Sequence, residues 1–164
     1  MTTAVKEEIF ELNRNVAGIT ERDLAAKTAD GSLVPVWEYP VPVGEALVFD
    51  SKDVFSAYLE DEGVPAECVG SGVVAAVKVD IVIMDSSKQN VRSILNMLQY
   101  GDVTDFTDED KLAHLDIAPG EQVIAREQER VCIRVNCPGA VATLDASASY
   151  FRLTCKRVRH TLFA

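Results

Sequence analysis

The chain has 164 residues, of which 48% are hydrophobic and 26% charged, and its 26 acidic and 16 basic residues give a net charge of −10. A chain of this length is most simply one globular domain, which can bury a core without disulfides or metal ions. The acidic balance argues against a nucleic-acid-binding protein, because phosphate neutralisation needs a basic surface. No apolar stretch approaches the ~20 residues of a membrane span, and the acidic N-terminus does not resemble a secretory signal. We therefore expect neither nucleic acid nor a membrane as a partner.

Residues 1–30 differ in pattern from the rest of the chain. Val5, Ile9 and Leu12 recur near helical spacing, with Phe10 beside Ile9, which predicts one or two short helices. Besides Met1, only four of the first fifteen residues are large apolar groups, so an extended arm that becomes ordered on a neighbour fits equally well. We therefore divide the chain into an arm or short helices at 1–30 and a β-sandwich domain at 31–164.

Strand-like alternation begins near residue 33 and runs through three short segments. In the first, residues 33–44, three prolines remove backbone donors, which favours an edge strand. Residues 46–50 and 53–61 are two more strand candidates, separated by a turn around residues 51–53.

Trp37 and Tyr39 project to the same side of the first of these strands. Both side chains bury a large area, so the pair predicts a face that is buried in the core or in a subunit contact. The other interpretation is an aromatic platform for sugars. It makes a carbohydrate-binding module the alternative function.

The strongest strand signal lies at residues 73–85. Every second residue from Val73 to Ile83 is apolar and falls on one face, which must be buried. The opposite face carries Lys78 and Asp80 near its centre, and we expect that centre to meet solvent. A second sheet packed on the apolar face would bury it, which predicts a sandwich.

Further elements are expected in the second half of the chain. Residues 91–100 favour a strand, and residues 107–115 carry acids in the first turn of a short capped helix. Residues 121–136 suggest a β-hairpin that turns at 127–130, and a long strand closes the chain at 149–163. With about eight strands, the fold class is all-β: a two-layer antiparallel β-sandwich, jelly-roll-like, with one or two short helices.

The sequence shows no constellation of catalytic or metal-binding residues. It has no serine elbow, phosphate loop or dinucleotide fingerprint, and its two histidines cannot supply a cupin metal site. The cysteines at positions 68, 132, 137 and 155 lack CxxC spacing and suit small apolar fillers in a reducing compartment. We expect no catalytic residue, no cofactor and no metal, and Asp85 is interpreted as a turn former.

The closing segment is unusual because it carries cations and no acid. Arg152, Lys156, Arg157 and Arg159 give the last thirteen residues a net charge of +4, against −14 for the rest of the chain. These cations pair either with acidic strands of the same chain or with an acidic neighbour, and the sequence favours neither explanation.

The phase of this strand changes toward its end. Its apolar face starts at Phe151 and repeats at every second residue to Cys155. Continued further, the same face would take Arg157 and Arg159 inward. We therefore expect a bulge, or the end of the sheet, near Lys156.

The arrangement of arm, long strands and cationic ending resembles a known architecture. The arm leads into WEYPVPVGEALVF, the strands VAAVKVDIVIMD and VCIRVN follow, and TLDASASYFRLTCKRVRHTL closes the chain. In this order the chain resembles the β-sandwich decoration (cement) proteins of tailed viruses and, more distantly, the small single-jelly-roll coat proteins of other icosahedral viruses.

The resemblance implies a structural virion protein on the capsid surface, assembled in the host cytoplasm. Such a protein would have no enzymatic activity and no cofactor, and would bind the major capsid protein and its own copies, with a trimer favoured. The arm composition and the charge split nominate the contact residues: Ile9, Phe10, Leu12, Trp37, Tyr39, Arg152, Lys156, Arg157 and Arg159.

Overall fold

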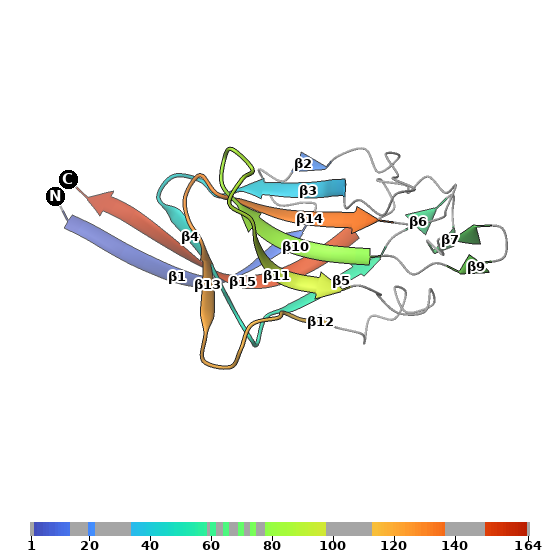
Figure 1. Ribbon diagram of the computed structural model, residues 1–164. Helices are drawn as coiled ribbons and strands as arrows, with labels where there is room; N and C mark the ends of the chain where they lie inside the picture. The colour runs from blue at the N-terminus through green and yellow to red at the C-terminus, as the bar shows by residue number, and fades with distance from the viewer. Residues whose placement is uncertain are drawn as a thin grey trace.

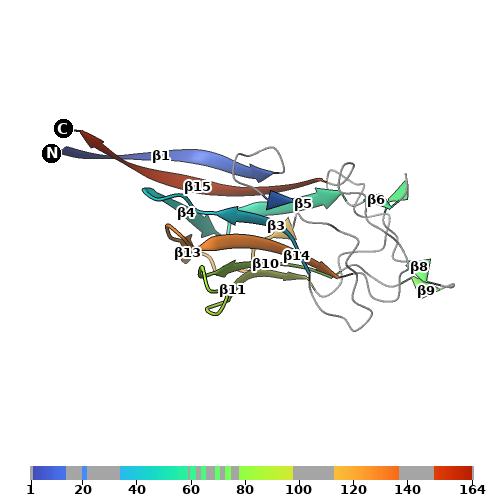
Figure 2. The ribbon, with the colours of Figure 1, turned by 90° about the horizontal axis from the view of Figure 1, so that it is seen from above.

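The computed structural model describes residues 2–13, 20–21, 34–58, 60–61, 64–65, 69–70, 73–74, 78–97, 113–136 and 150–163. All regular elements in these ranges are β-strands. They form two stacked antiparallel sheets, which Figures 1 and 2 show from two sides. The predicted all-β, two-layer sandwich is therefore confirmed.

The first sheet has six strands and the second has five, with two small strand pairs beside them. The first sheet consists of β1 (Thr2–Asn13), β15 (Tyr150–Phe163), β4 (Glu45–Asp50), β5 (Val54–Tyr58), β13 (Gln122–Ala125) and β12 (Ala113–His114). The second consists of β11 (Arg92–Met97), β10 (Lys78–Met84), β14 (Arg130–Asn136), β3 (Val34–Pro40) and β2 (Thr20–Glu21). The small pairs are β6 (Glu60–Asp61) with β7 (Val64–Pro65), and β8 (Val69–Gly70) with β9 (Val73–Val74).

The closing strand β15 organises the first sheet. It pairs with β1 along its length, and it also pairs with β5 through residues 150–153 and with β4 through residues 156–159. β4 and β5 are both antiparallel to β15, so they follow each other in the same direction with an interruption at residues 51–53. The predicted interruption at residues 51–53 is present. It separates two strands that run in the same direction beside β15, so it is not a hairpin turn.

The core lies between the two sheets and is built from the apolar faces that alternation predicted. Ile81 and Ile83 of β10 are fully buried, and so are Phe151, Leu153 and Cys155 of β15. The Trp37 ring from the second sheet lies 4.8 Å, centroid to centroid, from the Phe151 ring of the first. This tilted aromatic contact joins the two layers.

No helix is seen in the described parts of the two segments for which the sequence raised one. Residues 2–13 form strand β1, in which Phe10 and Leu12 share the face that meets the core. For the helix predicted at 107–115, the described end is strand, since Ala113 and His114 pair with β5; residues 107–112 lie outside the described residues. Of the second N-terminal segment, only Thr20 and Glu21 are described, as β2.

The predicted hairpin at residues 121–136 is wrong in its pairing, although both strands exist. β13 pairs with β4 in the first sheet, whereas β14 pairs with β10 and β3 in the second. The turn between them, closed by a hydrogen bond from the Glu129 N–H to the Arg126 carbonyl, crosses from one layer to the other. Gln128 in this turn has φ of 68°.

The outer face of the second sheet also departs from expectation, because its centre is buried. Asp80 receives two hydrogen bonds from Arg134, and Glu38 receives one from Arg130. These charge-assisted pairs satisfy carboxylates that would otherwise be costly to bury. Cys132 is buried on the same face, and burial raises the pKa of its thiol to about 11.

Candidate assembly interface

The two ends of the described chain form one two-stranded ribbon, which we call the terminal ribbon (β1 with β15). Twelve residue pairs run without a register shift from Thr2 opposite Phe163 to Asn13 opposite Arg152. β4 stops pairing with β15 at Arg159, so the far end of the ribbon extends past the sandwich, as both views show (Figures 1 and 2).

The inner face of the ribbon is anchored in the core at one end. Leu12 is 2% exposed and belongs to the core cluster, and Phe10 packs against that cluster with its ring 6.1 Å from the Tyr39 ring. The guanidinium of Arg157 lies over the Phe10 ring, 4.0 Å from its centroid. Arg157 therefore does point inward, and it caps the apolar face instead of interrupting it.

This arrangement corrects the bulge expected near Lys156. β15 keeps an unbroken register with β1, and the irregularity lies in the strand on its other side, at residues 51–53. The face of β15 that carries Phe151 and Cys155 continues in the same phase to Arg157 and Arg159, and both of these cations meet Glu8 of β1.

Beyond Phe10 the inner face becomes an ion-pair cluster around Glu8. Its carboxylate accepts a hydrogen bond of 2.7 Å from Arg157 Nε, and Arg159 lies 3.1 Å and Lys6 3.5 Å from it. Arg159 also lies 3.4 Å from Glu45 of β4. The hydrogen bond from Arg157 is the main reason that the pKa of Glu8 is lowered from 4.5.

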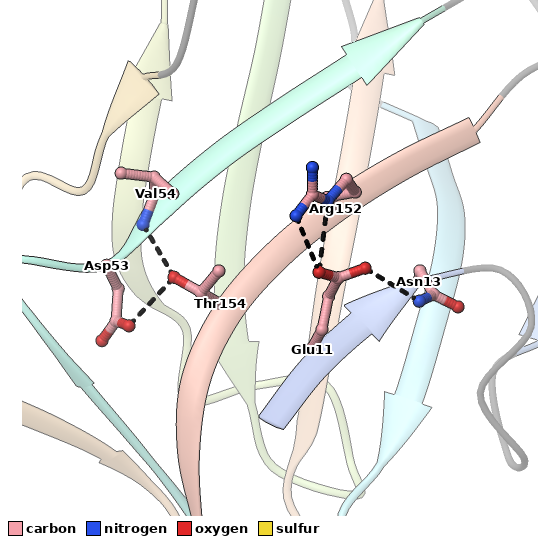
Figure 3. A network of polar contacts seen from close by, with 6 residues as sticks. All are labelled: Glu11, Asn13, Asp53, Val54, Arg152 and Thr154. Carbon is pink, nitrogen blue, oxygen red and sulfur yellow. Dashed lines mark hydrogen bonds and ion pairs between the residues drawn. The ribbon is translucent and has the colours of Figure 1, made fainter. Parts of the chain in front are cut away.

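The outer face carries a second row of pairs, part of which Figure 3 shows. Arg152 donates to the Glu11 carboxylate at 3.0 and 3.2 Å, and Asn13 donates to the same carboxylate at 3.1 Å. Burial acts to raise the pKa of Glu11, but these hydrogen bonds outweigh it and the pKa is lowered from 4.5. Further along the ribbon, Lys156 lies 3.4 Å from Glu7.

The four cations of the closing segment thus all have acidic partners within the chain. Arg152, Lys156, Arg157 and Arg159 meet glutamates of β1, and Arg159 also meets β4. Of the two explanations that the sequence left open, pairing within the chain is the one seen in the structure.

The interruption between β4 and β5 is fixed by a polar contact from β15, also visible in Figure 3. The Thr154 hydroxyl accepts a 3.0 Å hydrogen bond from the Val54 N–H and donates one of 3.0 Å to the Asp53 carboxylate. Burial raises the pKa of Asp53 above its ordinary value. The side chain of Thr154 therefore supplies the backbone partner that the irregular ladder lacks.

The nominated contact residues fall into different environments. Ile9 is 89% exposed on the outer face of β1, whereas Leu12, Trp37 and Tyr39 are at most 4% exposed. The last three are core residues in this chain, which confirms the core interpretation of Trp37 and Tyr39 and means that these side chains are not exposed to a neighbour in the monomer. With Trp37 and Tyr39 buried, the aromatic platform on which the carbohydrate-binding alternative rested is also absent.

The sequence reasoning missed the acids that complete the ribbon. Glu7, Glu8 and Glu11 lie in β1 opposite the cations of β15. A signal was present, since the strand with four cations and no acid has a complement in a short segment with three glutamates. A helical period groups these glutamates on different faces from those that they occupy in the strand, so the pattern did not indicate which acids face the cations.

Asp85 is a turn former, as its position predicts. Its carboxylate accepts hydrogen bonds from Ser87 and Asn90 side chains and from the Gln89 N–H, which lower its pKa to about 2. In the described part of the chain, no group of three potential metal ligands comes together. Those residues also include no helix long and apolar enough to cross a membrane.

Comparison with known proteins finds likeness in structure but not in sequence. No protein-family model and no curated protein matches the sequence. VP17, a capsid protein of bacteriophage P23-77, superposes with a TM-score of 0.57 over 99% of this chain and 100% of its own, at 8% identity. The complex of VP16 and VP17, the two major capsid proteins of that phage, gives a TM-score of 0.53 over 94% and 99%, also at 8% identity. The two-sheet, jelly-roll-like fold of this chain is thus similar to the fold of VP17.

Proposed function

We propose that the protein is a structural component of a virus particle, which assembles through contacts with its own copies and with a second capsid protein. The observation that supports this most is the extent of the fold match, which covers 99% of this chain and the whole of VP17. Two proteins that had only a β-sandwich in common would superpose over their sheets alone. Here the match covers nearly all of this chain and the whole of VP17. Such a role uses surfaces and edges and needs neither catalysis nor a cofactor.

A second capsid protein is the partner that the comparison suggests. VP17 has been solved in complex with VP16, the other major capsid protein of the same phage. By analogy of fold, this chain would bind a comparable shell protein in the virion, after assembly in the host cytoplasm. Weak contacts repeated over a shell add up through multivalency, so each contact can be small.

Two roles in the particle remain as proposals, building the shell or decorating it. The resemblance read from the sequence implied a decoration protein, favoured as a trimer on the capsid surface. We now favour shell building, because the matched fold belongs to a major capsid protein. The two roles differ in what their loss does: a shell without its building block does not form, whereas an undecorated shell forms and is merely less stable.

The test uses particles from cells that produce the virus. Density-gradient fractions are analysed by mass spectrometry for peptides of this chain, and particles are counted by electron microscopy with and without its gene. We expect the chain to sediment with the particles in many copies, and we expect particles to disappear without the gene. Intact particles without the gene would favour decoration, and absence of the chain from purified particles would overturn the virion role.

A further inference from the structure

The terminal ribbon presents an open strand edge. β1 is hydrogen-bonded to β15 on one side, and no other described strand pairs with it. In Figure 2 it lies at the margin of the molecule. It is twelve residues long, contains no proline and has no register shift. Native proteins usually shorten, bend or cover such an edge, because its free N–H and C=O groups recruit another strand.

Two apolar side chains are exposed on the outer face beside this edge. Ile9 is 89% and Val5 61% exposed, and both project from the outer face of β1. The neighbouring acids Glu7 and Glu8 are each paired with a cation of β15, which reduces their repulsion of a second acidic strand. One lysine and three glutamates give β1 a net charge of −2, and four cations give β15 a net charge of +4. The terminal ribbon therefore has a net charge of +2.

We propose that β1 pairs edge to edge with β1 of a second copy of this chain, antiparallel about a two-fold axis at Glu7. A two-fold axis perpendicular to the sheet keeps inner faces together, so outer residues meet outer residues. With Glu7 at the axis, Val5 of each copy faces Ile9 of the other, and Lys6 faces Glu8. The two exposed apolar side chains then face each other, and Lys6 and Glu8 face opposite charges.

Neighbouring registers are less favourable on the same criteria. An axis at Lys6 sets Lys6 against itself and Val5 against Glu7. An axis at Glu8 sets Glu8 against itself and Ile9 against Glu7. The register at Glu7 also contains a like-charge contact, Glu7 with Glu7, but there each carboxylate already has Lys156 of its own chain 3.4 Å away.

The first experiment is sedimentation velocity of the full-length chain over a concentration series. We expect a concentration-dependent dimer for the wild type and for Val91→Lys, a control at a half-exposed apolar residue away from the ribbon. Ile9→Lys should remain monomeric while keeping the circular-dichroism spectrum of the wild type. A wild type that stays monomeric at its highest soluble concentration, or a dimer that survives Ile9→Lys, would overturn the proposal.

The second experiment reads the register. Residues at the axis lie about 5 Å apart between Cα atoms, within disulfide range, whereas Ile9 lies about 13 Å along the strands from its own copy. Under mild oxidation, Glu7→Cys should therefore give a disulfide-linked dimer, and Ile9→Cys should give no more than the wild type. Equal cross-linking of both variants would contradict the register. The proposal does not rest on the virion role, because a monomer would refute it and leave the particle experiment unaffected.

Discussion

Replacement of Leu12 by Ala tests whether β1 belongs to the folding core or is a detachable arm. Leu12 is 2% exposed and lines a small void between the sheets, together with Trp37 and Phe151. Leu→Ala in a core costs about 2–5 kcal/mol, and more where the surroundings cannot collapse. Because rings held by both sheets surround Leu12 and already leave a void, we expect a loss of about 3–4 kcal/mol.

Ile9 provides the matched control on the same strand. It is 89% exposed in the monomer, so at concentrations at which the chain is monomeric Ile9→Ala removes an aliphatic side chain of the same size without opening a cavity. We expect it to change the free energy of unfolding by no more than about 0.5 kcal/mol.

The measurement is urea unfolding followed by the fluorescence of Trp37, the only tryptophan of the chain and a core residue. With a slope of about 2 kcal/mol per molar urea, Leu12→Ala should lower the midpoint by roughly 1.5–2 M at unchanged slope, and Ile9→Ala by about 0.2 M. If the two midpoints fell equally little, β1 would not be part of the cooperative unit. That result would support the interpretation of residues 1–30 as a separate arm.

Replacing Arg157 by Met, which removes the bond to Glu8 and the cation–π contact, should cost about 1–2 kcal/mol. Lys156→Met, at an exposed pair, should cost less than about 0.5 kcal/mol in the same urea assay, and equal losses would contradict the capping role of Arg157. Thr154→Val leaves a backbone N–H unsatisfied and should cost about 1–3 kcal/mol, whereas Thr154→Ser keeps the hydroxyl and should lose less; a valine variant as stable as the serine variant would count against this. The pKa values of Glu8 and Glu11 are lowered from 4.5 in the folded state, so the stability they contribute is present above that value and is lost as the pH falls below it. The urea midpoint of a Glu8→Gln/Glu11→Gln variant should decline less between about pH 5 and pH 3 than that of the wild type, and parallel declines would refute this origin of acid sensitivity.

The sequence predicted best those strands whose two faces differ most. In β15, the run from Phe151 to Cys155 alternates strictly with polar residues, and its apolar face is fully buried as expected. The same holds for Ile81 and Ile83 of β10. Alternation indicates that one face is covered, because the face of a strand that packs in the apolar core carries an apolar residue at every second position.

Partners of strands were harder to predict than the strands. β13 and β14 are joined by a short turn of the kind that closes hairpins, yet they belong to different sheets. Turn residues fix the local backbone, whereas the choice between a hairpin and a crossing depends on which apolar faces the rest of the chain leaves open. Burial of Asp80 was missed for a similar reason, because its partner Arg134 is 54 residues away in sequence.

The helix expected in the N-terminal segment shows how a short pattern misleads. Val5, Ile9 and Leu12 satisfy helical spacing, but Phe10 and Leu12 face the core while Val5 and Ile9 are exposed. In a segment of twelve residues, helical and strand periods share several positions, and the pairing with β15 decided between them.

The ion pairs of the ribbon contribute more to register than to stability. Most join exposed side chains, and such pairs are typically worth less than about 1 kcal/mol each. A slip of one residue would turn Leu12 out of the core. Sliding β1 by two residues so that Lys6 met Arg157 would place Glu8 opposite the buried Cys155 and so remove it from its position opposite Arg157. The pairing of Glu8 with Arg157 therefore favours the alignment that buries Leu12 and exposes Ile9, and in this alignment no other described strand pairs with the outer edge of β1.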